Sequence, residues 1–260
     1  MKIGYLGPKG SFSEEALQLF ITTYKDILEP PIEQVAFSTI PKLLIACQNG
    51  EIEGAFVPLE NSTEGQVGVT MDVLGQTESL YIIREFIHPV EQCLITAKPM
   101  DYGQIEQVYS HEQALGQCRD FLETHLPHAQ QYTCPSTTEA VRKIAQHPQE
   151  NWAAIGPKRA ATIYNLHCHS ERIQDSMLNA TRFIFVGHHL AEMQDDDKTS
   201  LLIMTGDTPG SLANVLQEFA VRNINLSRIE SRPSKRKLGE YVFFIDIDGY
   251  VFSPAIQDAL

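Results

Sequence analysis

The chain has 260 residues and a formal net charge of −13, with 20 Lys and Arg against 33 Asp and Glu. Its 43% hydrophobic and 20% charged residues are typical of a globular protein and exclude a disordered or fibrous chain. The length predicts about two domains. No apolar run approaches the roughly 18 residues of a membrane-spanning helix, and no signal-like segment opens the chain, so neither a membrane nor a secreted protein is expected. The negative charge disfavours a nucleic-acid partner.

The five cysteines are odd in number and scattered, and none stands in a CxxC pair. This pattern favours reduced thiols in a cytoplasmic protein over a disulfide framework. Two groups look like metal ligands at first sight, His167-Cys168-His169 and His188-His189. Adjacent residues do not share a face, however, and no second ligand cluster stands at a known spacing, so we expect no metal site.

Residues 1–190 alternate short apolar runs with amphipathic segments, the pattern of a layered α/β domain. In chain order we expect strands at 2–6, 54–59, 81–87, 92–96, 152–155 and 181–186. The expected helices start after Ser11, Thr39, Ser110 and Ser136, whose side chains can accept hydrogen bonds from first-turn N–H groups. Glu14 and Glu139 predict capping boxes in the first and last of these, and the third helix is expected to span 111–126.

A charged, non-periodic stretch at 194–198 predicts a linker. Beyond it we expect strands at 200–204, 226–231 and 241–247, with helices that start at Pro209-Gly210 and at Ser253. This order of elements is that of a ferredoxin-like βαββαβ unit without its final strand. A basic run, Lys235-Arg236-Lys237, lies between two of the strands. The sequence therefore predicts two domains, residues 1–190 and 198–260.

Four segments place small polar residues where a strand is followed by a loop or helix, the position at which α/β sheets bind ligands. They are residues 7–13, 60–65, 110–113 and 179–183. Segment 7–13 could bind an anion through backbone N–H groups at a helix start, although it matches neither GxGxxG nor GxxxxGKS/T.

Each of these segments also has a plain structural interpretation: a Gly turn into a capped helix, an Asx turn, an N-cap at Ser110, and an arginine that points to solvent from an edge strand. Otherwise Arg182 needs an acidic partner or a ligand, because it begins an apolar strand. These residues alone do not choose between an enzyme and a solute-binding sensor.

Taken together and in this order, the segments resemble the prephenate dehydratase family over essentially the whole chain. The blocks that carry the resemblance are GPKGSFSEEAL, VPLENSTEGQV, SHEQAL and NATRFIFVG, while PGSLANVL and ESRP resemble the paired signatures of an ACT regulatory domain. One position departs from the family pattern, since Glu112 stands where the third block often has Pro. No chorismate mutase segment precedes Met1, which resembles the monofunctional type.

The resemblance implies two α/β lobes like those of a periplasmic binding protein, followed by the ACT domain. It implies conversion of prephenate to phenylpyruvate with loss of CO2 and water, a step of phenylalanine synthesis that needs no cofactor or metal. It places catalysis on Thr181, Arg182 and Phe183: the first would hydrogen-bond the departing hydroxyl, the second hold a substrate carboxylate, and the third keep the surroundings apolar. The implied substrate-binding residues are Ser11, Asn61, Ser62, Thr63, Ser110, His111 and Gln113.

The ACT resemblance implies a homodimer or homotetramer that binds phenylalanine as an allosteric effector. The residues implied for that site are Gly210, Ser211, Leu212, Ala213, Asn214, Val215, Glu230, Ser231, Arg232 and Pro233. Two alternatives stay open at this point. One is arogenate dehydratase, whose substrate differs in an amino group, and the other is a non-catalytic two-lobed sensor with an ACT domain.

Overall fold

The computed structural model describes residues 1–25, 28–77, 79–234 and 240–260. It divides into two compact units, Met1–His189 and Leu190–Leu260. The basic run Lys235-Arg236-Lys237 lies outside the described residues. Within the described ranges, no helix combines the length and the hydropathy that crossing a membrane requires.

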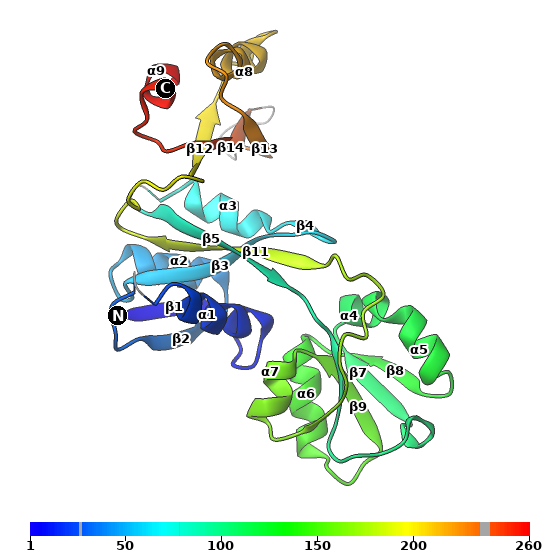
Figure 1. The fold of residues 1–260 in the computed structure, drawn as a ribbon. Helices are drawn as coiled ribbons and strands as arrows, with labels where there is room; N and C mark the ends of the chain where they lie inside the picture. The colour runs from blue at the N-terminus through cyan, green and yellow to red at the C-terminus, as the bar shows by residue number, and fades with distance from the viewer. Residues whose placement is uncertain (26–27, 78, 235–239) are drawn as a thin grey trace. The chain divides into compact units, whose positions relative to one another are not determined.

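The first lobe of Met1–His189 is built on a mixed sheet with the strand order β2-β1-β3-β11-β5, and β4 pairs with β3 (Figure 1). Strands β1, β2 and β3 are parallel, whereas β11 runs antiparallel to both of its neighbours. Its elements are β1 (Lys2–Leu6), α1 (Phe12–Thr23), β2 (Glu33–Phe37), α2 (Ile40–Gln48), β3 (Gly54–Asn61), β4 (Gly65–Gln66), α3 (Gly68–Leu74), β5 (Tyr81–Pro89) and β11 (Ala180–Gly187).

The second lobe has its own sheet, with the order β10-β6-β9-β7-β8. Its elements are β6 (Cys93–Thr96), the 3-10 turn η1 (Tyr102–Gln104), β7 (Gln107–Ser110), α4 (Glu112–Gln117), α5 (Arg119–His125), β8 (Gln130–Thr133), α6 (Thr137–Gln146), β9 (Trp152–Gly156), α7 (Lys158–Ile163) and β10 (His167–Ser170). The chain enters this lobe between β5 and β6 and leaves it between β10 and β11. Figure 1 shows the two segments that pass between the lobes, one after β5 and one before β11.

The two crossing segments are tied to each other by hydrogen bonds. The Val90 N–H donates to the Asn179 carbonyl (2.8 Å), and the Ile173 N–H donates to the Gln92 carbonyl (3.0 Å). The side chain of Gln174 adds a third bond, because its Oε1 accepts from the Gln92 N–H (2.9 Å). The segments that connect the lobes thus form a paired ribbon rather than independent linkers.

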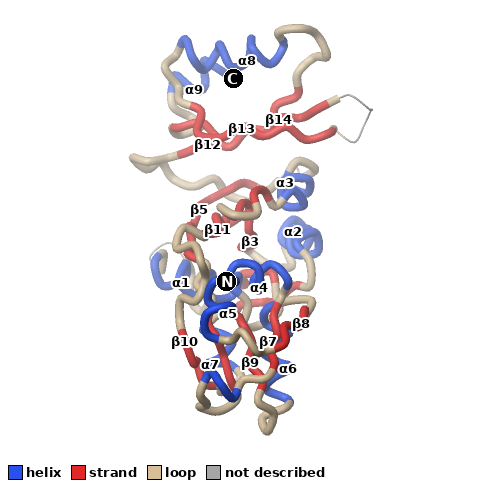
Figure 2. The backbone as a smooth tube through the Cα atoms, turned by 90° about the vertical axis from the view of Figure 1, so that its right-hand side faces the viewer, coloured by secondary structure: helices blue, strands red, loops and turns tan. Residues whose placement is uncertain are grey.

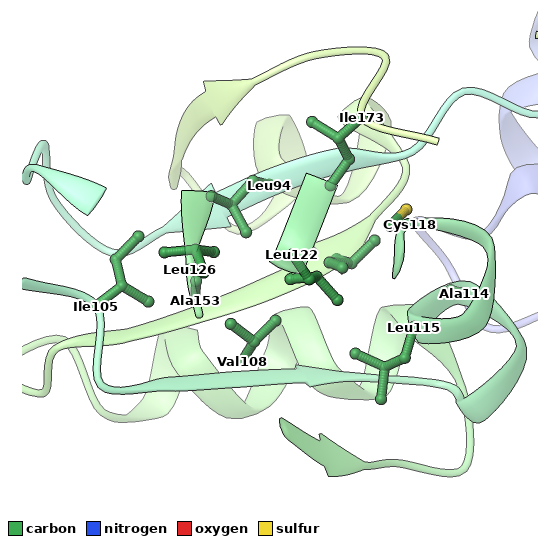
Figure 3. Packing of buried hydrophobic residues seen from close by; sticks show 11 residues of the cluster. Leu94, Ile105, Val108, Ala114, Leu115, Cys118, Leu122, Leu126, Ala153 and Ile173 are labelled. Atoms are coloured by element: carbon green, nitrogen blue, oxygen red, sulfur yellow. The ribbon is translucent and has the colours of Figure 1, made fainter. Parts of the chain in front are cut away.

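Helices cover both faces of each sheet. On one face of the first lobe, Leu17 and Phe20 of α1 pack on Phe56, Phe183 and Phe185 of the sheet. In the second lobe the leucines of α4 and α5 pack on Leu94, Val108 and Ala153, as Figure 3 shows in close view. Cys118 belongs to this core, where burial raises the pKa of its thiol to about 12 and keeps it neutral.

The helix predicted over 111–126 is in fact two helices, α4 and α5, which meet at Cys118. The backbone of Cys118 leaves the helical region, with φ at −119°, and its N–H bonds to the Leu115 carbonyl, three residues back. The predicted N-cap at Ser110 is also wrong. Ser110 is buried on β7 and donates its hydroxyl to the Ile155 carbonyl (2.7 Å), so His111 caps α4 instead. Gly116, two residues before Cys118, is the one local signal of the break between α4 and α5.

The unit Leu190–Leu260 has the predicted order of elements, and the expected α/β fold of the chain is confirmed. Its strands pair antiparallel in the order β12-β14-β13. Figure 2 shows α8 and α9 on the same side of this sheet, where Phe219 and Ile256 pack on Ile245 and Ile247. The elements are β12 (Lys198–Met204), α8 (Ser211–Val221), β13 (Leu226–Pro233), β14 (Tyr241–Asp248) and α9 (Pro254–Ala259).

Candidate active site

A pocket with a volume of about 330 Å³ lies where the two sheets and the crossing segments of Met1–His189 meet. Most of its lining is made of neutral polar side chains and the first residues of helices. From the first lobe and the crossing segments come Phe12, Asn61, Val90, Gln92, Asn179 and Thr181, and from the second lobe come His111, Gln113, Ala114, Gln117, Pro135, Ser136 and Thr137.

The hydroxyl of Thr181 is held by the side chain of Asn61. Thr181 lies on β11 opposite Asn61 of β3, and Asn61 Nδ2 donates to Thr181 Oγ1 (3.0 Å). The orientation of this amide is fixed because Asn61 Oδ1 accepts from the N–H groups of Thr63 and Glu64 (both 2.9 Å). A threonine hydroxyl has two acceptor lone pairs and one donor. Since Asn61 uses a lone pair, the Thr181 O–H is left to donate to a ligand in the pocket.

The Asn61 amide is also the end of a chain of amides that joins the lobes. Asn61 Nδ2 donates to Asn179 Oδ1 (3.0 Å), and Asn179 Nδ2 donates to Gln117 Oε1 on α4 (3.2 Å). Gln92 Nε2 donates to the same Gln117 oxygen (3.4 Å). Sequence reasoning missed Gln92 and Gln117, and it assigned no role to Asn179 within the candidate segment 179–183. Asn179 begins the NATRFIFVG block and Gln117 follows SHEQAL by two residues, so proximity to these blocks was the signal available.

The starts of α1, α4 and α6 line the pocket through Phe12, Gln113 and Thr137. First-turn N–H groups have no intrahelical partner, and the helix dipole favours an anion beside them. At α4 the cap is His111, whose Nδ1 accepts from the Gln113 N–H (3.4 Å). A neutral imidazole that accepts at Nδ1 carries its proton on Nε2, so His111 can donate as well. The lining therefore suits a ligand with negatively charged oxygens.

Two predicted substrate-binding residues, Ser62 and Thr63, hold the backbone beside the pocket. Ser62 Oγ accepts from the Ala180 N–H (2.9 Å) and donates to the Leu178 carbonyl (2.9 Å). Thr63 contributes its N–H to Asn61. These bonds fasten the start of β11 to the end of β3, which sets the position of the neighbouring Thr181.

The hydroxyls of Ser11 and Ser110 also bond to the backbone. Ser11 Oγ donates to the Leu6 carbonyl (3.1 Å) and accepts from the Glu14 N–H (3.3 Å), so it caps α1 as predicted. The predicted capping box is modified, because the Glu14 carboxylate accepts from the Gly10 N–H rather than from Ser11. Ser110 is committed to the carbonyl of Ile155. Of the predicted substrate-binding residues, the pocket brings together Asn61, His111 and Gln113.

Arg182 and Phe183 lie next to Thr181 in the chain but are not among the residues that line the pocket. Arg182 meets the acidic partner that the sequence required: its Nε and Nη2 both lie 2.8 Å from Glu85 Oε2, and Nη1 lies 4.0 Å from Glu60. The solvent-facing edge-strand alternative is wrong, because β11 pairs with a strand on each side. Phe183 is buried and stacks on Phe56, with ring centroids 4.9 Å apart.

His169 of β10 has protein partners at both ring nitrogens. His169 Nε2 lies 2.8 Å from the Met100 carbonyl, and its Nδ1 lies 3.0 Å from Ser170 Oγ. In the part of the chain that the structure describes, no three His, Cys, Asp or Glu side chains are grouped so that they could hold a metal ion.

Comparison with models of known protein families shows to which family the chain belongs. The sequence model of prephenate dehydratase matches residues 3–191, and that of the ACT domain matches residues 199–251. The chain belongs to the prephenate dehydratase family. The resemblance found in the sequence is thereby confirmed, and with it the enzyme class, a carbon–oxygen lyase.

The similarity to individual members of the family extends over nearly the whole chain. The chain is 38% identical over 262 residues to prephenate dehydratase of Amycolatopsis methanolica, covering 100% of this chain and 83% of that relative. It is 36% identical over 259 residues to the Bacillus subtilis enzyme, covering 95% and 88%. Among solved structures, prephenate dehydratase from Arthrobacter aurescens in complex with L-Phe has a TM-score of 0.87 at 32% identity, covering 100% and 84%.

The residues that resemble the ACT signatures lie on two elements of Leu190–Leu260. Residues 210–215 form the N-cap and first turns of α8, where Gly210 adopts the left-handed conformation with φ at 87°. Residues 230–233 form the end of β13, where Glu230 pairs with Arg228 (2.7 Å) and lies 4.0 Å from Arg232.

Asn61→Asp tests the geometry at Thr181. The substitution keeps an oxygen for the Thr63 and Glu64 N–H groups but replaces the Nδ2 donor by a second oxygen. The Thr181 hydroxyl then donates to the new carboxylate instead of into the pocket. We expect kcat for prephenate to fall by about 100-fold or more, with a thermal unfolding midpoint close to that of the wild type. A variant with wild-type kcat would contradict this account of the site.

Proposed function

We propose that the chain converts prephenate to phenylpyruvate, with loss of CO2 and water, in the pocket of residues 1–190. The observation that carries the proposal is the fixed Asn61 amide on Thr181 Oγ1, which leaves the threonine O–H to donate inside the pocket. A donor held in place before the reaction stabilises developing negative charge without any cost of reorganisation during it.

The chemistry requires little more than positioning. Aromatisation of the ring drives the reaction, so the protein must orient a dicarboxylate, stabilise the departing hydroxyl and favour loss of a carboxylate as CO2. Thr181 donates to the departing hydroxyl. The first turns of α4 and α6, with Gln113, His111 and Asn61, hold the remaining oxygens. The reaction needs neither a cofactor nor a metal.

Arg182 and Phe183 do not line the pocket and support its residues from the neighbouring part of the sheet. Because the Arg182 guanidinium is bonded to Glu85, we assign it to holding β11 in register rather than to a substrate carboxylate. Phe183 supports the strand through its stack on Phe56. Ser11, Ser62, Thr63 and Ser110 likewise contribute through the backbone that they fasten.

Thr181→Val and Thr181→Ser separate the hydroxyl from the shape of the side chain. Valine removes the donor at nearly constant volume, and we expect kcat to fall by about 100- to 1,000-fold, as for the loss of one transition-state donor. Serine keeps the donor and should retain most of the turnover. The measurement is phenylpyruvate formation from prephenate by the purified chain at neutral pH.

Arogenate is assayed beside prephenate in the same experiment. Faster turnover of arogenate would assign the chain to arogenate dehydration. If the wild type turned over neither substrate, the binding-sensor alternative would replace the enzyme. If Thr181→Val turned over prephenate at the wild-type rate, the hydroxyl would have no catalytic role.

The ACT unit is proposed to bind L-phenylalanine and to inhibit the enzyme. Support comes from the similarity to the Arthrobacter aurescens enzyme in complex with L-Phe. The site comprises the start of α8 (Gly210, Ser211, Leu212, Ala213, Asn214 and Val215) and the end of β13 (Glu230, Ser231, Arg232 and Pro233). The N-terminus of a helix is suited to the carboxylate of an amino acid.

Added L-phenylalanine should lower prephenate turnover and raise the thermal unfolding midpoint, since a ligand of the folded state stabilises it. D-phenylalanine serves as the control and should do neither at the same concentration. Unchanged turnover with saturating L-phenylalanine would refute feedback regulation.

The chain is further proposed to act in the cytoplasm as a homodimer or a dimer of dimers. Its free cysteines suit a reducing compartment. The ACT sheet exposes apolar side chains on its strands, among them Met204, Ile229 and Tyr241, which a second copy could cover. Light scattering at micromolar concentration should give a mass of two or four chains, and a monomer alone would exclude this assembly.

A further inference from the structure

The proposed reaction consumes one proton per turnover. Prephenate enters with two carboxylates and phenylpyruvate leaves with one, so the hydroxyl departs as hydroxide unless a proton joins it to make water. The Thr181 hydroxyl can donate a hydrogen bond but cannot supply this proton unaided, because an alkoxide is too strong a base to be left behind. Among the described residues that line the pocket, His111 is the one histidine.

A second histidine lies directly beside Thr181 but behind the pocket wall. His88 of β5 stands opposite Thr181 in the antiparallel pair of β5 and β11. Directly opposed residues present their side chains on the same face of a sheet, about 4.5–5.5 Å apart at Cβ. His88 is therefore a lateral neighbour of Thr181 on the face that α1 covers.

His88 is buried, with the Glu15 carboxylate near one ring nitrogen and no hydrogen-bond partner within the described residues at the other. The residue is only 5% exposed, and its ring stacks on Phe86, with centroids 6.5 Å apart. Its Nε2 lies 3.8 Å from the carboxylate of Glu15 on α1. Its Nδ1 is buried and has no hydrogen-bond partner within the described residues. Buried polar atoms are nearly always bonded, so this orphan nitrogen requires an explanation.

Thr181 Oγ1 offers that explanation. Asn61 occupies one acceptor lone pair of this oxygen, and a hydroxyl has two. We propose that His88 is a positioning residue that acts through Thr181, with its Nδ1–H donating to the remaining lone pair when the ring is charged. Hydrogen bonds of this kind are often long in the free enzyme and shorten once substrate is bound. The inference rests on the proposed function, since it assigns the source of the proton that the reaction consumes.

The proton then moves in a balanced sequence. As the carbon–oxygen bond of the substrate breaks, the Thr181 O–H proton passes to the departing hydroxide and forms water. The Thr181 oxygen takes the Nδ1 proton of His88, which becomes neutral and keeps its Nε2 proton towards Glu15. Solvent returns a proton to His88 after the products leave.

Side chains of three elements face His88. On α1, the group that faces the ring is the Glu15 carboxylate, 3.8 Å from Nε2. On β11, the directly opposed residue Thr181 is neutral. On β5 itself, Phe86 is apolar, while Glu85 alternates to the opposite face of the sheet with Arg182. Of the facing groups named here, Glu15 is the charged one.

The test is the pH dependence of kcat, measured for the wild-type chain and for three variants. We expect kcat of the wild type to fall towards alkaline pH as the ring loses its proton. His88→Gln should lower kcat about 100-fold at neutral pH, the low end of general acid–base effects, and should lack the alkaline fall. KM should change little, because His88 does not line the pocket. His128→Gln, at an exposed site, is the matched control and should keep the wild-type profile.

If His88→Gln does not fold, Glu15→Gln tests the same inference. Glu15 is partly exposed, so its substitution should leave the fold intact. Loss of the carboxylate should move the alkaline fall to lower pH. His111→Gln should reduce turnover yet keep the alkaline fall. A His88→Gln enzyme with the wild-type profile, a Glu15→Gln enzyme with an unmoved profile, or loss of the fall in His111→Gln would overturn this inference alone. A wild type without prephenate turnover would instead overturn the proposed function, and this inference with it.

Discussion

The hydrogen bond from Asn61 to Thr181 joins residues 120 positions apart, and the rest of the site depends on it. It exists because β11 returns from the second lobe and pairs between β3 and β5. That insertion sets Asn61 on one side of Thr181 and His88 on the other. The Asx-type bonds from Thr63 and Glu64 then fix the amide, which in turn fixes the direction in which the threonine hydroxyl can donate.

A chain of net charge −13 must still attract an anionic substrate. The lining resolves this conflict with neutral donors and helix starts, which act over short distances and are worth most where water is excluded. Arg182 and Glu85, which lie near the site, are paired with each other on the other face of the sheet. The net charge of the chain thus disfavours an anionic substrate, while the helix starts and neutral donors of the pocket favour its carboxylates.

The amide chain through Asn179, Gln117 and Gln92 connects these features to both lobes. Its members come from both crossing segments and from α4, so a change in the angle between the lobes must alter these hydrogen bonds. The same network holds the Thr181 hydroxyl through Asn61. The position of the Thr181 hydroxyl therefore depends on contacts from both lobes.

The sequence by itself determined the elements whose signals are local. Apolar runs located most of the central strands, and Ser11, Thr39 and Ser136 were recognised as caps because a cap depends on residues three positions away. The ordered blocks also gave the family, since each motif is contiguous. The edge strands β2, β8 and β10 were missed, because their exposed and polar residues carry no clear alternation.

Only the tertiary structure decided which residues of each block share the pocket. The Ser110 hydroxyl is buried and donates to a carbonyl of β9, so His111 caps α4 in its place. The spacing of residues in the sequence does not show this difference. Arg182 and Thr181 are adjacent in sequence, yet strand alternation sends them to opposite faces, one to Glu85 and the other to the pocket. His88 and Gln117 gained their place from strand register and lobe contact, both of which are long-range and therefore invisible in a local pattern.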